Sequence, residues 1–230
     1  MRKISPEERR IMRRSYAEKI METVRTKGFI TLTIQDLARL MGISRASLYN
    51  FFASKEDIVL EVTEIYIDYL KRTNKFISNP RYPYSQRLPS VFEQAAFSAV
   101  YSSEIYLNEL KITCPSLYER KLEVSDERLS TLHAFYENGM IDGDFNLLNP
   151  SLIVAQDDAA LGKILNSSFL IDQGISLEDS MYGYYKIMKH RTFAPASLKA
   201  SKDPYIDKVV AIIVGQLTKS NSSELQKIEG

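Results

Sequence analysis

The sequence predicts an all-α protein, because its apolar residues recur with helical spacing along nearly the whole chain. Residues that start and stop helices lie at the ends of these apolar segments. No run of alternating apolar and polar residues is convincing as a strand, and no internal repeat is visible. With 230 residues, 44% of them hydrophobic, the chain suits one large domain or two small ones.

A first helix is expected over residues 6–27. Ser5 is a typical N-cap, Pro6 suits the first helical position, and Glu8 completes a capping box. Gly28 then favours termination of the helix. One apolar face follows the spacing i, i+3, i+4, i+7 and consists of Ala17, Ile20, Met21 and Val24.

Two short helices are expected between residues 34 and 52, separated by a tight turn at Gly42, where a left-handed backbone is favoured. Ala38 is small where the two helices would cross, and Ser44 caps the second of them. A small residue, a glycine four positions later and five apolar positions in register indicate a helix-turn-helix, and the alternative is an ordinary short helical hairpin. The five apolar positions are Leu37, Met41, Ile43, Leu48 and Phe51.

The rest of the chain is also predicted to be helical. A long helix is expected from about residue 54 to 77, and the proline-rich segment 79–89 is expected to be a loop. Residues 139–149, which contain Asp142-Gly143-Asp144, are expected to form a connector rich in turns. Further helices are expected near residues 90–101, 103–113, 116–137, 150–171, 177–192 and 203–219.

The charge of the chain is distributed unevenly. Its formal net charge is only +1, which argues against a generally polybasic protein. Residues 1–55 contain 12 Lys/Arg and 5 Asp/Glu, a balance of +7, whereas residues 56–230 contain 18 and 24, a balance of −6. A basic amino-terminal segment followed by an acidic remainder is expected when one end of a protein meets a polyanion.

Several function classes find no support in the sequence. The single Cys114 excludes an internal disulfide and a multi-cysteine zinc site, and neither His133 nor His190 has more than a lone possible partner for a metal. There is no phosphate-binding glycine loop and no nucleophile elbow. The most apolar run, Val209 to Leu217, is far shorter than the roughly 20 residues that span a bilayer. We therefore expect a soluble, cytoplasmic protein without a cofactor, metal, catalytic site or membrane partner.

The exposed start of the third helix carries residues that can contact DNA. Recognition helices usually present this end to base edges in the major groove. Arg45 can donate to guanine, Ser47 can donate or accept, and Ala46 allows close approach to a thymine methyl. Tyr49 and Asn50 lie one turn further on. The alternatives are a half-buried packing role for Tyr49 and plain solvation for Asn50.

Lys55 is placed where a cation opposes the helix dipole, at a cost of about 0.3–1 kcal/mol. A phosphate bound between Lys55 and the free N–H groups of that helix start would reverse the sign of the effect, and the alternative is a solvated lysine. Thr33 begins another helix that offers donors to a second phosphate. Four arginines of the first helix can add attraction that does not depend on DNA sequence, although each alone is expected to be solvated: Arg9, Arg10, Arg13 and Arg14.

Four short segments in this region form one pattern: Thr33-Ile34-Gln35-Asp36-Leu37-Ala38, Met41-Gly42-Ile43-Ser44, Ser47-Leu48-Tyr49-Asn50-Phe51-Phe52 and Ser54-Lys55-Glu56. Together they resemble the DNA-binding signature of the tetracycline-repressor (TetR/AcrR) family. The close resemblance covers about residues 10–65, and the remainder is similar only in length and helical character. It implies a homodimer that binds a palindromic operator in double-stranded DNA and represses transcription until a small molecule binds the carboxy-terminal domain.

The resemblance also implies a division into a helix-turn-helix DNA-binding domain, residues 1–54, and a helical regulatory and dimerisation domain, residues 55–230. Asn50 stands where the family often has His, and Ala46 where Gly or Pro is frequent, which leaves the operator sequence open. The residues that fall where the family contacts DNA are Thr33, Gln35, Ser44, Arg45, Ala46, Ser47, Tyr49, Asn50 and Lys55.

The larger domain offers candidates for a ligand pocket and a dimer surface. A pocket is expected to be largely apolar with a few polar groups, although aromatic residues at helical spacing more often form core. The ligand candidates are Phe92, Phe97, Tyr101, Tyr106, Tyr118 and Phe135. By the resemblance, residues 150–171 and 177–192 form the dimer surface, with Ile153, Leu161, Leu165, Phe169, Met181, Tyr184 and Met188 as its apolar candidates.

Two other functions remain open at this point. The first is a similar DNA-binding protein that acts in a structural or protein-interaction role without control by a small molecule. The second is a helical enzyme or carrier whose basic amino-terminal segment docks on an acidic protein.

Overall fold

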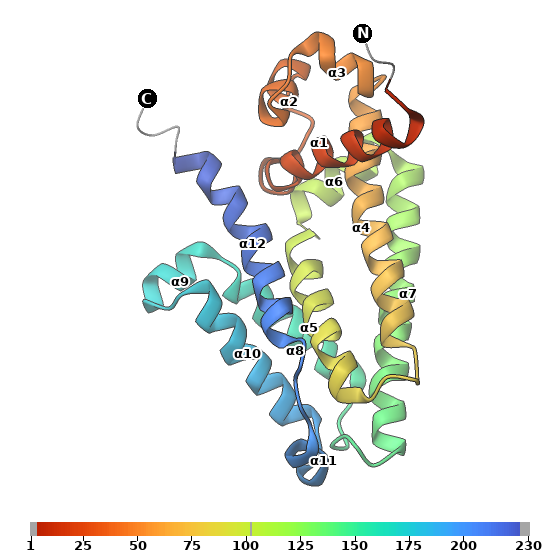
Figure 1. The fold of residues 1–230 in the computed structure, drawn as a ribbon, viewed down its shortest axis with the longest axis vertical. Helices are drawn as coiled ribbons and strands as arrows, with labels where there is room; N and C mark the ends of the chain where they lie inside the picture. Colours follow the sequence, from red (N-terminus) through yellow and green to blue (C-terminus); the bar gives the residue numbers. More distant parts are fainter. Residues whose placement is uncertain (1–3, 102, 226–230) are drawn as a thin grey trace. The chain divides into compact units, whose positions relative to one another are not determined.

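The computed structural model describes residues 4–101 and 103–225, including their side chains except at position 167 and from position 218 onward. The described residues form helices and no strand, apart from one isolated bridge between Phe145 and Phe193 (Figure 1), so the predicted all-α class is confirmed. The helices are α1 Pro6–Lys27, α2 Ile34–Met41, α3 Arg45–Phe51, α4 Lys55–Ile77, α5 Tyr84–Tyr101, α6 Glu104–Thr113, α7 Pro115–Ile141, α8 Pro150–Ile164, α9 Ser167–Gln173, α10 Leu177–Thr192, α11 Pro195–Ala200 and α12 Ile206–Leu225.

The chain divides into two compact units. Unit 1 consists of Met1–Tyr69 and Tyr101–Val124, and unit 2 of Leu70–Val100 and Ser125–Gly230. Unit 1 therefore contains α1 to α3, α6 and the adjoining parts of α4 and α7, and α6 packs against α1. The predicted division between residues 54 and 55 separates the helix-turn-helix from the rest of the chain, and it remains a proposal about function.

The amino-terminal helices begin and end at the residues that the sequence indicates. Ser5 forms the expected capping box with Glu8, and α1 ends before Gly28, whose φ is 74°. Gly42 has a left-handed backbone, with φ 73° and ψ 33°, as the tight turn between α2 and α3 requires. The Ser44 hydroxyl accepts a hydrogen bond from the N–H of Ser47 at the start of α3.

The core of unit 1 forms where the helix-turn-helix packs on α1. Ala17, Ile20 and Val24 of α1 are buried, and Ala38 of α2 is 4% exposed, as its expected place at a helix crossing requires. Of the five apolar positions that define the motif, Leu37, Met41, Leu48 and Phe51 are buried and Ile43 is partly buried against the same cluster.

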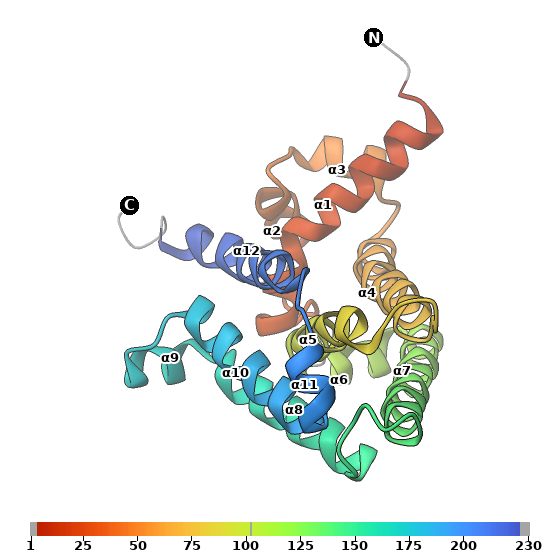
Figure 2. The same cartoon turned by 60° about the horizontal axis from the view of Figure 1, so that its bottom comes forward.

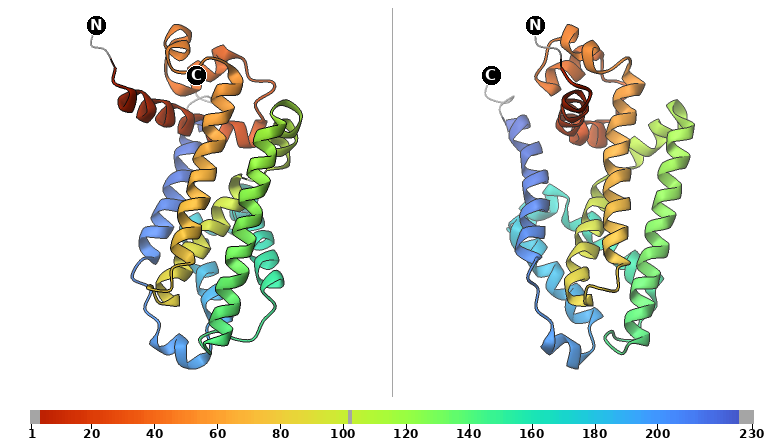
Figure 3. Two further views of the ribbon diagram at one scale, coloured as in Figure 1. Left: turned by 90° about the vertical axis from the view of Figure 1, so that its right-hand side faces the viewer. Right: turned by 45° about the vertical axis from the view of Figure 1, so that its right-hand side comes forward.

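The parts of α4 and α7 that belong to unit 1 run alongside each other (Figure 3). Arg120 of α7 donates to both carboxylate oxygens of Glu64 in α4, which ties the two helices together. The Thr63 hydroxyl of α4 forms a hydrogen bond with the Tyr106 hydroxyl of α6. The first half of α4 is therefore held from α6 and α7 as well as from the helix-turn-helix.

The second half of α4 is followed by a shorter loop than expected. The sequence predicts a loop over residues 79–89, but α5 begins at Tyr84 and contains Pro89. Pro89 lies early in the helix, where its missing N–H costs one backbone hydrogen bond. Burial of Leu88 and Phe92, both fully inaccessible to solvent, compensates for that loss.

The carboxy-terminal helices differ from expectation in their boundaries. The single helix expected over 150–171 is interrupted, because α8 ends at Ile164 and the side chain of Asn166 caps a separate α9. The helix α7 extends into the expected 139–149 connector, as far as Ile141. The short α11, which begins with Pro195, is an element that the sequence did not indicate.

Within unit 2, α8 and α10 lie near each other (Figure 2), and hydrogen bonds of a buried polar cluster join them. Asp157 of α8 accepts hydrogen bonds from the Tyr184 hydroxyl at 2.7 Å and from Arg191 at 2.9 Å. Aromatic rings of Tyr84, Phe135 and Phe145 pack together elsewhere in the unit, with centroids 4.7 to 5.5 Å apart. No described helix is both long enough and apolar enough to cross a membrane.

Candidate nucleic-acid interface

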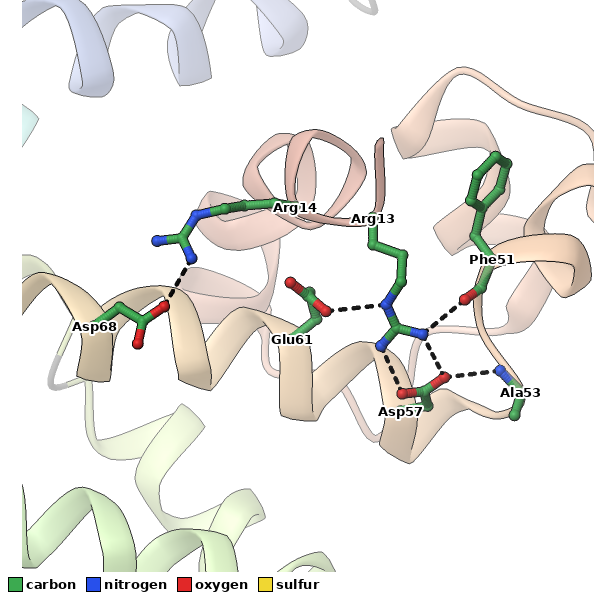
Figure 4. A network of polar contacts seen from close by, with 7 residues as sticks. All are labelled: Arg13, Arg14, Phe51, Ala53, Asp57, Glu61 and Asp68. Carbon is green, nitrogen blue, oxygen red and sulfur yellow. Dashed lines mark hydrogen bonds and ion pairs between the residues drawn. The ribbon is translucent and has the colours of Figure 1, made fainter. Parts of the chain in front are cut away.

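Arg13 of α1 fixes the end of α3 and the start of α4 (Figure 4). Its guanidinium donates to the carbonyl oxygen of Phe51 at 2.7 Å, to Glu61 at 3.0 Å and to both carboxylate oxygens of Asp57 at 2.7 and 3.0 Å. Asp57 also accepts the N–H of Ala53 at 2.9 Å. These bonds fix α3 on α1, because a planar guanidinium satisfies several acceptors in one geometry.

Most arginines of α1 are therefore paired with carboxylates. Arg14 donates to Asp68 of α4 at 2.8 Å (Figure 4), and Arg10 pairs with Glu7 one turn earlier in α1. The charge balance of +7 thus overstates what this helix offers to a polyanion. The sequence predicts that each of these arginines is solvated. Arg13 instead holds α3 and α4 on α1.

The exposed side of α3 carries the residues predicted to read DNA. Arg45, Ala46, Tyr49 and Asn50 are exposed, and Ser47 is half-buried with its hydroxyl 2.9 Å from that of Ser44. Tyr49 is 47% exposed, so about half of its surface is free to meet DNA. The Arg45 guanidinium lies 5.8 Å from the centre of the Tyr49 ring, so these two side chains form one exposed patch.

Thr33 and Gln35 lie at the start of α2. The Thr33 hydroxyl accepts the N–H of Asp36 at 3.1 Å and donates to the Asp36 carboxylate at 2.6 Å. The hydrogen bonds from Thr33 lower the pKa of Asp36. Gln35 is exposed and is available to a phosphate or sugar. Because the Thr33 hydroxyl already donates to Asp36, it would have to divide that hydrogen bond between Asp36 and a phosphate in order to contact DNA.

Lys55 has an internal partner that the sequence did not indicate. Its Nζ donates to the backbone carbonyl of Ile30, in the turn between α1 and α2, at 2.7 Å. An ammonium group has three donors, so two remain for a phosphate. Lys55 is thus neither fully solvated nor committed entirely to the protein.

The nine residues predicted to contact DNA all lie in unit 1, on the start of α2, on α3 with its cap, and on the start of α4. Their roles in binding remain predictions. Sequence reasoning missed Glu109 and the structural role of Arg13, and these two side chains support this region from α6 and α1. A local signal could not have found them, because their partners lie 38 and 79 positions away in the chain.

Unit 1 also contains a small, partly open cavity of about 20 Å³, which has room for about one water molecule. Two of the six predicted ligand residues, Tyr101 and Tyr106, line it. Burial raises the pKa of each of these two tyrosines to about 12, so both are neutral phenols at physiological pH. Among the described residues, the cavity is lined by Met21, Val24, Arg25, Val62, Thr63, Tyr66, Tyr101 and Tyr106.

The other predicted ligand residues lie outside that cavity. Phe92, Phe97 and Phe135 are buried in unit 2, where Phe92 packs on the Tyr185 ring at 5.4 Å. Tyr118 is partly buried against the core of unit 1, beside Lys111. The first three fit the core role that is the alternative for aromatic residues at helical spacing.

The apolar residues predicted for the dimer surface are mostly buried within unit 2. Leu165 and Phe169 are half-buried. The large exposed apolar side chains on α8 and α10 are instead Leu152, which is 70% exposed, and Ile187, which is 57% exposed. The buried candidates are Ile153, Leu161, Met181, Tyr184 and Met188.

Among the described residues, no group of three or more His, Cys, Asp or Glu side chains is arranged to hold a metal ion. Cys114 is a free thiol at the end of α6.

Residues 18–62 match the family described as bacterial regulatory proteins, tetR family. The matched segment runs from α1 into α4 and contains the whole helix-turn-helix. No curated protein gives a significant match to the chain.

Solved structures with the same fold include three regulators. KstR2, a ketosteroid transcriptional regulator of Mycobacterium tuberculosis, is 17% identical, with a TM-score of 0.59 over 79% of this chain and 95% of that chain. A putative transcriptional regulator from Saccharomonospora viridis, in complex with choline, is 19% identical, with a TM-score of 0.56 over 79% and 97%. PfmR, a TetR-family regulator from Thermus thermophilus, is 20% identical, with a TM-score of 0.52 over 75% and 96%.

These likenesses concern the fold, and the family match concerns the helix-turn-helix. Proteins of this family are transcriptional regulators rather than enzymes. The chain therefore carries a helix-turn-helix of the tetR family at residues 18–62 and shares its all-α fold with TetR-family regulators.

Proposed function

We propose that the protein is a homodimeric repressor that acts in the cytoplasm, binds a palindromic operator and is released by a small, largely apolar ligand. The observation that carries the DNA-binding part is the exposed patch on α3, where Arg45 and Tyr49 are exposed while Leu48 and Phe51 of the same helix are buried. Arg45 can donate to O6 and N7 of guanine, and Tyr49 can reach a phosphate.

The proposed dimer follows from what one short helix can read. A single α3 has seven residues and can contact only a few base pairs, whereas two copies related by a two-fold axis read two half-sites. We propose that α8 and α10 form the interface. Leu152 and Ile187 supply exposed apolar surface on those two helices, and the buried candidates pack beneath them.

The proposed ligand site is the cavity of unit 1. Its walls are nearly all apolar, apart from the tyrosine hydroxyls, Thr63 and Arg25. Arg25 is already paired with Glu22, and the Thr63 hydroxyl is bonded to Tyr106. This lining suits a small uncharged molecule. Because the walls include α1, on which α2 and α3 pack, an occupant that widens the cavity would displace the DNA-reading helices.

A mobility-shift titration with the DNA that flanks the protein's own gene tests the proposal. We expect binding that weakens steeply with salt, and we expect Tyr49→Ala and Lys55→Ala each to weaken it while the protein stays folded. Arg39→Ala is a matched control, because Arg39 is exposed on α2 and paired with Asp36. DNA affinity unchanged by both substitutions would refute the assignment of this face.

The dimer and the ligand are tested separately from DNA binding. Sedimentation at micromolar concentration that gave only a species of about 26 kDa, the mass of one chain, would exclude the homodimer. Operator binding that persists in the presence of every small molecule that stabilises the protein would support a regulator that is not controlled by a ligand.

A further inference from the structure

The turn between α1 and α2 is held by a carboxylate from α6. Glu109 Oε2 accepts the backbone N–H groups of Phe29 and of Ile30, the latter at 3.0 Å. Two adjacent N–H groups that converge on one anionic oxygen form strong, charge-assisted bonds. Glu109 is half-buried, and its partners lie about 80 positions earlier in the chain.

Gly28 makes room for this carboxylate. Its φ of +74° is unfavourable for residues with a side chain, and a Cβ at this position would overlap the Glu109 carboxyl group. A second bond ties the same region to α6, because the Ser103 hydroxyl donates to the carbonyl oxygen of Arg25 at 2.7 Å. The end of α1 and the following turn are thus docked on α6 at two points.

The same turn orients Lys55. Ile30 gives its N–H to Glu109, and its carbonyl oxygen accepts the Nζ of Lys55 at 2.7 Å. A lysine side chain is long and flexible, and a phosphate that binds a freely rotating ammonium must overcome its loss of rotamer freedom. Anchoring one of the three ammonium donors on Ile30 removes part of that cost before DNA arrives.

We propose that Glu109 is a positioning residue for DNA binding, which acts through the backbone of Ile30 to hold Lys55 ready for a phosphate. This inference rests on the proposed operator binding and adds a residue of α6 to it. Glu109 does not itself touch DNA, since its carboxylate would repel a phosphate. Its effect passes through one peptide segment and one hydrogen bond.

A double-mutant cycle tests the inference on the full-length protein. The variants are Glu109→Ala, Lys55→Met and their combination, with Asn108→Ala as the control, because Asn108 is the exposed neighbour on α6. Operator affinity is measured across a salt series, and circular dichroism confirms that each variant is folded at the assay temperature. Glu109→Gln serves as the conservative variant, because its amide oxygen can still accept the two N–H groups.

We expect Glu109→Ala to weaken operator binding and to lower the slope of log affinity against log salt by up to about 0.9, the value for one phosphate contact. Between about 50 and 200 mM salt, the fall in affinity should therefore be smaller by up to about 3.5-fold. Glu109→Gln should recover most of the wild-type slope. In the Lys55→Met background, Glu109→Ala should change neither affinity nor slope further.

Three results would overturn the inference while leaving operator binding intact. These are an unchanged salt slope in Glu109→Ala, an effect of the same size with and without Lys55, and an equal effect of Asn108→Ala. If Glu109→Ala does not fold, the same cycle is run with Glu109→Asp, whose shorter carboxylate keeps the charge but moves away from the turn. A wild-type protein that binds no operator overturns the proposed function and this inference together.

Discussion

Arg13 and Asp57 form a bidentate ion pair between α1 and α4, with N–O distances of 2.7 and 3.0 Å. Their side chains are only 21% and 23% exposed. The same guanidinium donates to the last residue of α3, Phe51, and lies 4.7 Å from the centre of the Phe52 ring. One side chain of α1 therefore fixes both the end of α3 and the start of α4.

Replacing Arg13 should destabilise unit 1. Arg13→Ala leaves Asp57 and the Phe51 carbonyl without their main partner, so we expect a loss of about 1–3 kcal/mol in the free energy of unfolding, measured by urea titration. Arg13→Lys should recover only part of it, because an ammonium cannot replace the planar fork. Arg10→Ala is the control, since its partner Glu7 is 65% exposed, and no measurable change in stability is expected there. Equal losses in the two alanine variants would contradict this account.

The same ion pair gives unit 1 a dependence on acid. The hydrogen bonds from Arg13, followed by the Ala53 N–H, hold the pKa of Asp57 below its ordinary value of 3.8. A carboxyl group whose pKa is lower in the folded state stabilises that state above its unfolded pKa. The stabilisation is lost as the pH falls through the folded value. Below about pH 4, acidification should therefore lower the midpoint temperature of thermal unfolding less in Asp57→Asn than in the wild type. Near neutrality, the midpoint should vary with pH equally in the two proteins.

Local signals are enough to predict the helix-turn-helix. Capping by Ser5 and Ser44, and the left-handed turn at Gly42, depend on residues within four positions of one another. The break after Ile164 escapes prediction because helical apolar spacing continues across it and only Asn166 indicates a new start. Pro89 resembles a loop residue in the sequence, because the burial that offsets its cost inside α5 depends on tertiary contacts.

The residues that hold the predicted DNA-contacting helices in place cannot be predicted from local sequence, because their contacts are also tertiary. Arg13 is one of four similar arginines in the sequence, and only the approach of α4 distinguishes it from Arg10. The place of Lys55 in the first turn of α4 is visibly unusual in the sequence, but its partner Ile30 is 25 residues away. Tyr101 and Tyr106 are candidates by residue type, whereas the aliphatic wall of the cavity has no signature in sequence.

Arg45 should determine base preference more than overall attraction. Arg45→Ala removes the guanidinium that can pair with guanine, so we expect a loss of about 1–3 kcal/mol on the preferred operator and a smaller loss on non-specific DNA. Competition titrations with operators altered one base pair at a time should show relaxed preference at one position in each half-site. Lys55→Met should weaken binding to all these sequences alike. If Arg45→Ala does so too, Arg45 contacts phosphate instead of a base.

The proposed ligand cavity, about 20 Å³ in the free chain, must widen to accept a small aromatic alcohol. Phenol is a suitable probe, because the lining offers aromatic and aliphatic walls with tyrosine hydroxyls. We expect phenol to raise the unfolding temperature of the wild type and to weaken operator binding. Val62→Ile, which adds one methylene to the wall, should reduce both effects, whereas Val209→Ile in unit 2 should not. Equal responses in the two variants would place phenol elsewhere.

The proposed dimer should depend on exposed rather than buried apolar residues. Leu152→Asp and Ile187→Asp place charges at positions that are 70% and 57% exposed in a single chain, so each should leave the fold intact and shift sedimentation toward the monomer. Ile141→Asp, at a position 80% exposed at the end of α7, is the control and should leave the dimer unchanged. A dimer that survives both substitutions would place the interface on another surface.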